Sequence, residues 1–505
     1  MAPDGGIAKA FTGPFVQGLL SCKRGVAILA ALLAGCLQDA PSPPAPEPDA
    51  VAFLLVPSED GHGVPVTVYR PPGASSLDPA PVVLHTHGWG GSRETRLEAF
   101  REFLDAGLGV VSMDMRGHGE ARATSQSRLA SPAYELADVR AVVDAVAALP
   151  WVRLDAAGDP RVAAMGESYG GAVSLLAAAL DPRIDAVAAK DTWNDLAHAL
   201  APGGVPKTAF IASLWLSAAA QARLHPDVRG GFEAAVRQGA LPESVHLPFA
   251  RSSPAAYPEG IRAPTLLLQG VNDTLFDLGQ ALANHDLVAR TGAPATLVAH
   301  LGGHSLGDRP RPRQPDPCGE PNTLAVAWLR AHLGGEEASM PAVCLALDDG
   351  TVLRGTAALW DRPPVAVEAG ALSIRPGDLA SRDATPLLSA RNDTAVVGAP
   401  GLSGTAPAGA NGTVFWWLEA VAPGGQARRA NGQSHPMRLA GGPFETELAP
   451  VALRLREGEA LRLVVASHDP LFATPRGVEP QPWRLEGLKV RLPIACQGPG
   501  CAYST

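Results

Sequence analysis

The chain has 505 residues, of which 46% are hydrophobic, enough apolar material for two or three domains with cores of their own. Its formal net charge is −9 at pH 7, and no clustered run of lysines appears. Proteins that mainly bind nucleic acid usually carry a basic patch, so we do not expect that role.

The N-terminus predicts export. Lys23 and Arg24 precede an apolar run over residues 26–33, which is short for a membrane span but has the length of a signal-peptide core. We therefore predict a signal peptide over residues 1–36. A proline-rich linker over residues 37–50 would follow as a semi-extended tether.

The signal segment ends in the sequence LAGC at residues 33–36, which resembles the bacterial lipobox. In that motif the cysteine is acylated and becomes the mature N-terminus, so Cys36 would hold the protein on a membrane surface. The alternative is an ordinary cleaved signal peptide with an incidental cysteine. Either reading predicts an exported or extracytoplasmic protein.

A short apolar run at residues 81–85 ends in the glycine-rich sequence THGWGG at residues 86–91. This order is expected where the third strand of an α/β-hydrolase sheet enters its oxyanion loop. We expect the amide of Trp89, or of Gly88, to join the amide of Tyr169 in holding an oxyanion. The alternative is a plain turn at a strand end.

The next predicted strand, residues 109–113, runs into the polar turn DMRGHG at residues 114–119. We expect Arg116 to pin neighbouring loops through an arginine–carboxylate pair. We interpret His118 as an exposed loop histidine. If His118 were the catalytic base, it would come before the nucleophile Ser168 of the motif described next. The order along the chain of α/β-hydrolases is serine, acid, histidine.

The strongest signal is GESYGG at residues 166–171, a G-x-S-x-G motif. It lies between a predicted strand at residues 161–165 and a predicted helix at residues 171–180, the setting of a nucleophile elbow. Ser168 is then the nucleophile at a strained strand-to-helix corner, where flanking glycines avoid collisions with the neighbouring backbone.

Residues from about 192 to 260 have helical spacing and predict a cap inserted over the active site. Trp193 and Trp215 in this insertion, together with Tyr169, could line a substrate pocket. Core packing explains the tryptophans equally well, so both readings stay open.

Two later strands supply the remaining candidates. Asp273 follows the apolar run 264–270, at the end of a strand where ligand chemistry collects in parallel sheets. Asp277 competes with it but could merely cap the next helix.

His304 follows the run 295–300 and two glycines that free the loop, whereas His300 ends the strand and is expected to be packed. In the predicted mechanism His304 accepts the Ser168 proton, Asp273 holds the imidazole tautomer, and water hydrolyses the acyl-enzyme. This chemistry needs no metal or organic cofactor.

Of six cysteines, Cys22 and Cys36 belong to the N-terminal segment, which leaves four in the mature body, an even number that fits an oxidising compartment. Four cysteines allow three connectivities. The preferred hypothesis pairs Cys318 with Cys344 and Cys496 with Cys501.

The α/β-hydrolase domain is expected over residues 51–340, closing with a helix at residues 323–333. From residue 341 to 505, short β-prone runs separated by glycine and proline predict an all-β sandwich of jelly-roll, galactose-binding-like type. Trp416 and Trp417 alternate along one run, so one of them could be exposed to bind a sugar. Core packing is the alternative.

This arrangement resembles the Xaa-Pro dipeptidyl-peptidase and cocaine-esterase family of α/β-hydrolases with a C-terminal jelly roll. The resemblance spans residues 64 to 492 and lies in the segments 149–151, 166–171, 269–276, 302–304, 418–425 and 455–461. It implies the same triad of Ser168, Asp273 and His304. It also implies an ester or amide substrate, either a small molecule or a peptide that contains proline.

Two segments depart from the family pattern. The loop HGW at residues 87–89 replaces the tyrosine that often supplies an oxyanion donor, and the turn GEA at residues 119–121 lacks the usual serine. The alternative functions are therefore a carboxylesterase without peptidase activity and a non-catalytic surface binding protein that uses the jelly roll. The sequence sets no oligomeric state.

Overall fold

The computed structural model describes residues 50–306, 315–335, 340–472, 481–498, 501 and 503–504. The predicted signal segment, Cys36 and the proline-rich linker up to residue 49 lie outside the described residues. None of the described helices combines the length and the apolar composition that a membrane span needs.

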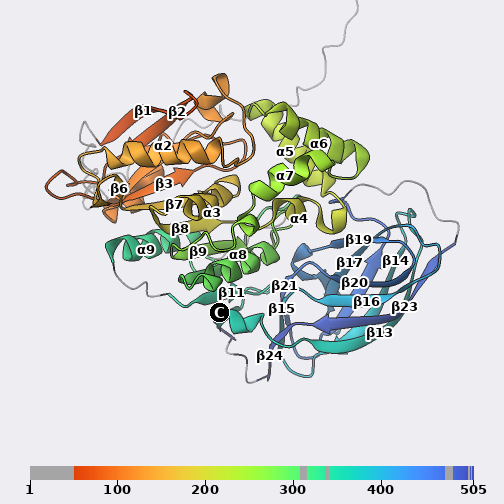
Figure 1. Cartoon of the computed structure of the whole chain (residues 1–505). Coiled ribbons are helices and arrows are strands. Elements are labelled where there is room, and N and C mark those ends of the chain that lie inside the picture. The colour runs from red at the N-terminus through yellow and green to blue at the C-terminus, as the bar shows by residue number, and fades with distance from the viewer. Residues whose placement is uncertain are drawn as a thin grey trace, which may run out of the picture. The chain divides into compact units, whose positions relative to one another are not determined.

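The first part of the chain is built on an 11-stranded sheet (Figure 1). In spatial order its strands are β1 (Val51–Pro57), β2 (Gly63–Tyr69), β4 (Gly109–Met113), β3 (Val82–Thr86), β7 (Val162–Glu167), β8 (Ile184–Lys190), β9 (Thr265–Gly270), β10 (Ala295–His300), β11 (Val343–Ala346), β12 (Val352–Gly355) and β25 (Tyr503–Ser504). Neighbours from β4 to β11 run parallel, and the outer pairs are antiparallel. Since parallel strands end at one edge, the residues that follow them gather there.

Helices cover both faces of this sheet. One face packs against α2 (Glu135–Ala147), α3 (Tyr169–Leu180) and α8 (Leu278–Arg290), and the other packs against α1 (Arg101–Asp105) and α9 (Pro321–Gly334). Alternate residues of the strands enter the two cores, as their period of two requires. The result is the three-layer architecture of an α/β-hydrolase.

The predicted helical insertion is present between β8 and β9. It contains α4 (Leu196–Leu200), α5 (Thr208–Gln221), α6 (Pro226–Gln238) and α7 (Glu243–Arg251). Phe210, Ile211, Phe232 and Phe249 are buried and join the core that faces α3 and α8. The insertion is therefore a cap that packs against the core of the hydrolase domain.

The C-terminal part is a sandwich of antiparallel sheets. One sheet holds β13 (Val365–Ile374), β23 (Trp483–Leu492), β16 (Gly401–Ala406) and β20 (Gly442–Glu447). Another holds β14 (Arg382–Ser389), β22 (Ala460–Ala466), β17 (Gly412–Val421), β18 (Ala427–Arg429) and β19 (His435–Leu439), and a small sheet joins β21 (Val451–Leu455), β15 (Thr394–Gly398) and β24 (Ile494–Gln497). Their inward side chains form a separate apolar core.

The boundary between the two domains does not fall at residue 341, where we expected it. Strands β11 and β12 lie beyond that position, yet they extend the hydrolase sheet, and β25 returns to it near the C-terminus. Strand β11 is buried along its whole length, so its backbone N–H and C=O groups need hydrogen-bond partners. Pairing with β10 and β12 supplies them. Which sheet a short apolar strand joins depends on distant partners, and local composition does not reveal it.

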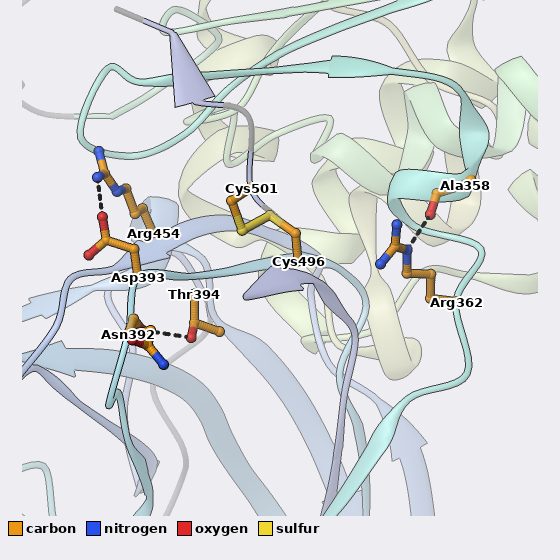
Figure 2. The surroundings of a disulfide bond; sticks show 8 residues. All are labelled: Ala358, Arg362, Asn392, Asp393, Thr394, Arg454, Cys496 and Cys501. Carbon is orange, nitrogen blue, oxygen red and sulfur yellow. Dashed lines mark hydrogen bonds and ion pairs between the residues drawn. A yellow bond between two sulfur atoms is a disulfide. The ribbon is translucent and has the colours of Figure 1, made fainter. Parts of the chain in front are cut away.

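Both disulfides of the preferred hypothesis are present. Cys344 on β11 is bonded to Cys318 just before α9, and Cys496 on β24 is bonded to Cys501. Figure 2 shows the second bridge, which lies close to the ion pair between Asp393 and Arg454. Each bridge restricts the unfolded chain and so stabilises the folded one.

The sugar-binding reading of the tandem tryptophans is wrong. Trp416 and Trp417 point to opposite faces of β17, but both are buried. The Trp417 indole donates to Glu419 at 2.7 Å, and the Arg429 guanidinium lies 3.8 Å from its ring centroid. Neither ring offers a free face for a ligand, because Trp416 lies in the core of the sandwich and Trp417 packs in a second apolar cluster that also contains Val205 of the cap insertion.

Arg116 does pin neighbouring segments. Its guanidinium donates two hydrogen bonds to Asp138 on α2, at 2.6 and 2.7 Å, and two to Asp60, at 2.7 and 2.8 Å. The side chains of Arg116 and Asp138 are 7% and 1% exposed, so this pair is a buried ion pair. Breaking one partner of such a pair leaves an uncompensated buried charge.

We therefore expect Arg116→Met to lower the free energy of unfolding by about 3–5 kcal/mol. The matched control is Arg101→Met, which removes a solvent-exposed ion pair with Glu98 and should change stability by no more than about 0.5 kcal/mol. Urea denaturation followed by circular dichroism measures both. Equal stability of the two variants would contradict the buried-pair interpretation.

Candidate active site

Ser168 lies at the corner between β7 and α3, with φ 57° and ψ −117°. This is a strained conformation for a residue that is not glycine. A Cβ atom on Gly166 would come within 2.5 Å of the Gly170 carbonyl carbon, and one on Gly170 within 2.1 Å of the Thr86 oxygen. The flanking glycines are therefore required by contact with the neighbouring backbone, as the motif predicts.

The structure brings Ser168 and His304 together, although they lie far apart in sequence. The Nε2 atom of His304 is 3.1 Å from the Oγ atom of Ser168. The Nδ1 atom of His304 is 2.6 Å from Oδ2 of Asp273. The three side chains thus form one hydrogen-bonded chain at the ends of β7, β9 and β10, in the order serine, histidine, acid.

Asp273 is fully buried and its second oxygen is also satisfied. Oδ1 accepts from the backbone N–H groups of Leu275 and Phe276, at 2.9 and 2.7 Å. Asp277, the competing acid, instead caps α8 by accepting from the Gly279 amide. The geometry therefore assigns the two carboxylates to different tasks.

The charged groups around His304 favour its protonated form, which a general base must adopt during the reaction. Burial raises the pKa of Asp273, while the charge and hydrogen bond of His304 act in the opposite direction. Burial lowers the pKa of His304, but the charge and hydrogen bond of Asp273 outweigh it, and the charges of Asp191 and Glu167 add to them. The net result is a pKa of His304 above its ordinary value, so the imidazolium is stabilised.

The glycine-rich loop lies against the nucleophile. A Cβ atom built on Gly88 would be 3.9 Å from Cβ of Ser168, and the loop turns back through a hydrogen bond from the Gly91 amide to the Gly88 carbonyl. Tyr169 is the first residue of α3, where N–H groups have no acceptor within the helix. The donation of the Trp89 and Tyr169 amides to an oxyanion stays a prediction.

The side chains of Trp89 and Tyr169 have structural partners. The Trp89 indole donates to the Leu214 carbonyl on α5 at 3.0 Å, which ties the loop to the cap. The Tyr169 hydroxyl is buried and accepts from the Ala130 amide at 3.0 Å. Trp193 is likewise buried and donates to the Ser252 carbonyl. Trp193 is therefore packed in the core, as one of its two readings expected, and Tyr169 is buried as well.

The expectation that His118 is exposed is wrong. It has no exposed surface and packs against Trp89 and Tyr169, with ring centroids 5.2 and 5.7 Å away. Burial lowers its pKa to about 4, so it stays neutral near pH 7. A loop sequence does not show that aromatic rings from two other segments, the loop with His87 and Trp89 and the start of α3 with Tyr169, will cover it.

The sequence reading missed Asp191. Its Oδ1 accepts from the Gly270 amide at 2.6 Å and lies 3.3 Å from Nε2 of His300. Asp191 follows the buried strand β8 directly, so the rule that singled out Asp273 could have found it. His300 is buried at the end of β10 as expected, and the pair ties together the ends of β8, β9 and β10.

Lys207 and Gln433 were also missed, and no sequence signal marks them. Lys207 precedes α5, is 4% exposed, and donates from Nζ to the Leu275 carbonyl at 2.7 Å. Gln433, in the sandwich, donates from Nε2 to the Asp273 carbonyl at 2.7 Å. Both side chains hold the turn that carries the candidate acid.

Within the described residues, no group of three or more His, Cys, Asp or Glu side chains is arranged to hold a metal ion. The Ser168–His304–Asp273 chain has the composition and order that nucleophilic acyl transfer needs.

Comparison with known proteins also points to a serine hydrolase. Residues 60–306 match the X-Pro dipeptidyl-peptidase family, S15. This part of the chain is an S15-family domain. All three members of the Ser168–His304–Asp273 chain lie inside the matched range, and residues beyond 306 lie outside it.

Two solved structures share the fold of the S15-family domain and the sandwich together. A CocE/NonD family hydrolase from Staphylococcus aureus has a TM-score of 0.65 at 12% identity, with 88% of this chain and 96% of that one covered. An aminopeptidase from a marine sediment Thaumarchaeota archaeon has a TM-score of 0.63 at 14% identity, with 91% and 99% covered. These identities establish a common fold.

A curated relative is the quorum-quenching protein AidA of Acinetobacter baumannii, 33% identical over 131 residues. That alignment covers 25% of this chain and 40% of the length of AidA. The likeness is therefore confined to a part of both proteins.

We expect Asp273→Asn to lower kcat by about 10⁴-fold, because the amide favours the wrong tautomer of His304. Activity requires neutral His304 and is lost as pH falls through its pKa, which Asp273 raises. The acid limb of the kcat/KM profile should therefore move to lower pH in the variant. Asp277→Asn is the control: asparagine also caps helices, so both kcat and the limb should stay unchanged.

Proposed function

We propose that this protein is a serine hydrolase that cleaves an ester or amide bond through an acyl-enzyme. The observation that carries the proposal is the hydrogen-bonded chain from Ser168 through His304 to the buried Asp273. The S15-family match over residues 60–306 supports it.

In this mechanism Ser168 Oγ attacks the carbonyl carbon of the substrate, and His304 Nε2 takes the hydroxyl proton. Asp273 holds the Nδ1 proton and stabilises the imidazolium. His304 then returns the proton to the leaving alcohol or amine. Water, activated by the same histidine, hydrolyses the acyl-enzyme and regenerates Ser168.

The proposed substrate is a small molecule or a peptide. The family match suggests that such a peptide would contain proline. Peptidase action would need an anionic group for the free amino terminus. Glu167, next to the nucleophile, is half exposed, but its carboxylate pairs with Lys190 at 3.1 Å. A carboxylesterase without peptidase activity is therefore the second candidate, because this pairing lowers the charge that would attract an ammonium group.

The sandwich is proposed to be a jelly roll of galactose-binding-like type, which its antiparallel sheets support. A non-catalytic surface binding role is disfavoured, because Trp416 and Trp417 are buried and the triad geometry is complete.

The substrate class is tested with p-nitrophenyl butyrate and Ala-Pro-p-nitroanilide, using the chain from residue 37 onward. We expect ester turnover that falls by roughly 10⁴- to 10⁶-fold in Ser168→Ala, and fluorophosphonate labelling of Ser168 only in the unmodified protein. Anilide cleavage that depends on Ser168 would assign a peptidase, and ester turnover alone a carboxylesterase. An unlabelled protein without turnover would contradict the hydrolase proposal.

We also propose that the protein is exported and anchored to a membrane through a lipid on Cys36. The two disulfides support an oxidising compartment. When the full chain is expressed in a bacterium with radiolabelled palmitate, we expect label and membrane-fraction recovery to depend on Cys36. Cys36→Ser should lose both, while Cys22→Ser should keep both. Release of unlabelled protein from the unmodified chain would point to an ordinary signal peptide.

A further inference from the structure

The turn that carries Asp273 is held from three directions. The carbonyl oxygen of Asp273 accepts from Gln433 of the sandwich, and that of Leu275 accepts from Lys207 of the cap, each at 2.7 Å. The carbonyl of Phe276 accepts from Gln269 on β9 at 2.8 Å. Each partner is buried, so water does not replace these hydrogen bonds easily.

One peptide unit connects Gln433 to both members of the acid–base pair. Its carbonyl belongs to Asp273 and accepts from Gln433, while its N–H belongs to Thr274 and donates to the His304 carbonyl at 2.9 Å. Because a peptide is planar, fixing the direction of the carbonyl also fixes the direction of the N–H. Gln433 therefore constrains the backbone of Asp273 and, through the same plane, that of His304.

Gln433 is buried, and the turn before it makes hydrogen bonds of its own. It follows the short turn Ala430–Gly432 between β18 and β19, in which Asn431 has φ 48°. The Asn431 side chain accepts from the Ala452 amide on β21 at 2.7 Å and reaches Asn272, the neighbour of Asp273, at 3.4 Å. Gln433 is 4% exposed. The hydrogen bond from Gln433 therefore holds the turn that carries Asp273 in a fixed place relative to the sandwich.

We propose that Gln433 of the β-sandwich is a positioning residue, which acts through the Asp273–Thr274 peptide to keep Asp273 aligned with His304. This inference rests on the proposed hydrolase function.

The test is Gln433→Met in the chain from residue 37 onward, assayed with p-nitrophenyl butyrate. Methionine keeps the length of the side chain and removes the N–H donor. We expect kcat to fall by about 10- to 100-fold, the effect of a small misplacement of a catalytic group, with KM changed by less than about threefold.

The acid limb of the kcat/KM profile is the second readout. It reports the pKa of His304, which is faced by the carboxylates of Asp273, Asp191 and Glu167. A weaker contact with Asp273 should move the limb to lower pH, as in Asp273→Asn but less far. Loss of stability alone would not move it.

Arg438→Met is the matched control. Arg438 also crosses from the sandwich, but it donates to the Gly204 and Gly239 carbonyls of the cap insertion. We expect unchanged kcat and an unchanged limb. Asn431→Gly is a second variant. Glycine adopts the positive φ freely, while the side-chain contacts with Asn272 and with the Ala452 amide are lost, so kcat should fall in the same direction.

The outcomes separate the two proposals. If the unmodified enzyme turns over ester while folded Gln433→Met and Asn431→Gly keep its kcat and pH profile, the positioning role is wrong and the hydrolase function stands. A lower melting temperature with an unchanged profile would also overturn the positioning role. If the unmodified chain neither turns over ester nor labels at Ser168, the hydrolase proposal is wrong, and this inference falls with it.

Discussion

A carboxylate without solvent exposure is the constraint on which the rest of this site depends. Burial raises the pKa of Asp273, and the contacts that favour its charged form are the two backbone amides at Oδ1 and His304 at Oδ2. Those contacts require a tight turn after β9, and a tight turn leaves its own carbonyls in need of donors. The cap, the sandwich and the sheet each supply one, through Lys207, Gln433 and Gln269.

A second constraint acts at the nucleophile. Ser168 occupies a strained backbone conformation, and the close approach of Gly166 and Gly170 to neighbouring backbone leaves no room for side chains. Helix α3 follows at once and is almost wholly buried by small and aliphatic residues, which fix the corner against β7 and β8. The strain is thus stored in an element that the core packing does not allow to relax.

The separate parts of the chain meet at this site. The Trp89 indole ties the glycine-rich loop to the cap. Asp191 accepts from Gly270 at the end of β9 and pairs with His300 at the end of β10, and Gln433 ties the acid turn to the sandwich. Such convergence explains how one rigid arrangement of three side chains can be assembled from distant segments. Substrate choice is then decided by the surroundings of this fixed centre, where the paired Glu167 is the nearest acidic neighbour of Ser168 in the chain.

The sequence alone determined the elements whose signals are local. The strand–turn–helix around Ser168, the strands that precede Asp273 and His304, and the order of the three side chains follow from periodicity, glycine placement and chain order. The two disulfide pairs agree with the preferred connectivity. The strand, turn and helix signals are specified by neighbouring residues, so a single sequence is sufficient to find them, whereas the cysteine pairing was one of three connectivities that the sequence allowed.

Only the tertiary structure decided what depends on distant packing. It buried His118, Trp416 and Trp417, and it placed β11 and β12 in the hydrolase sheet. It also brought Gln433 to the Asp273 carbonyl across 160 positions of sequence. The partner of a buried polar group is chosen by how whole elements pack, and no local pattern of residues encodes that choice.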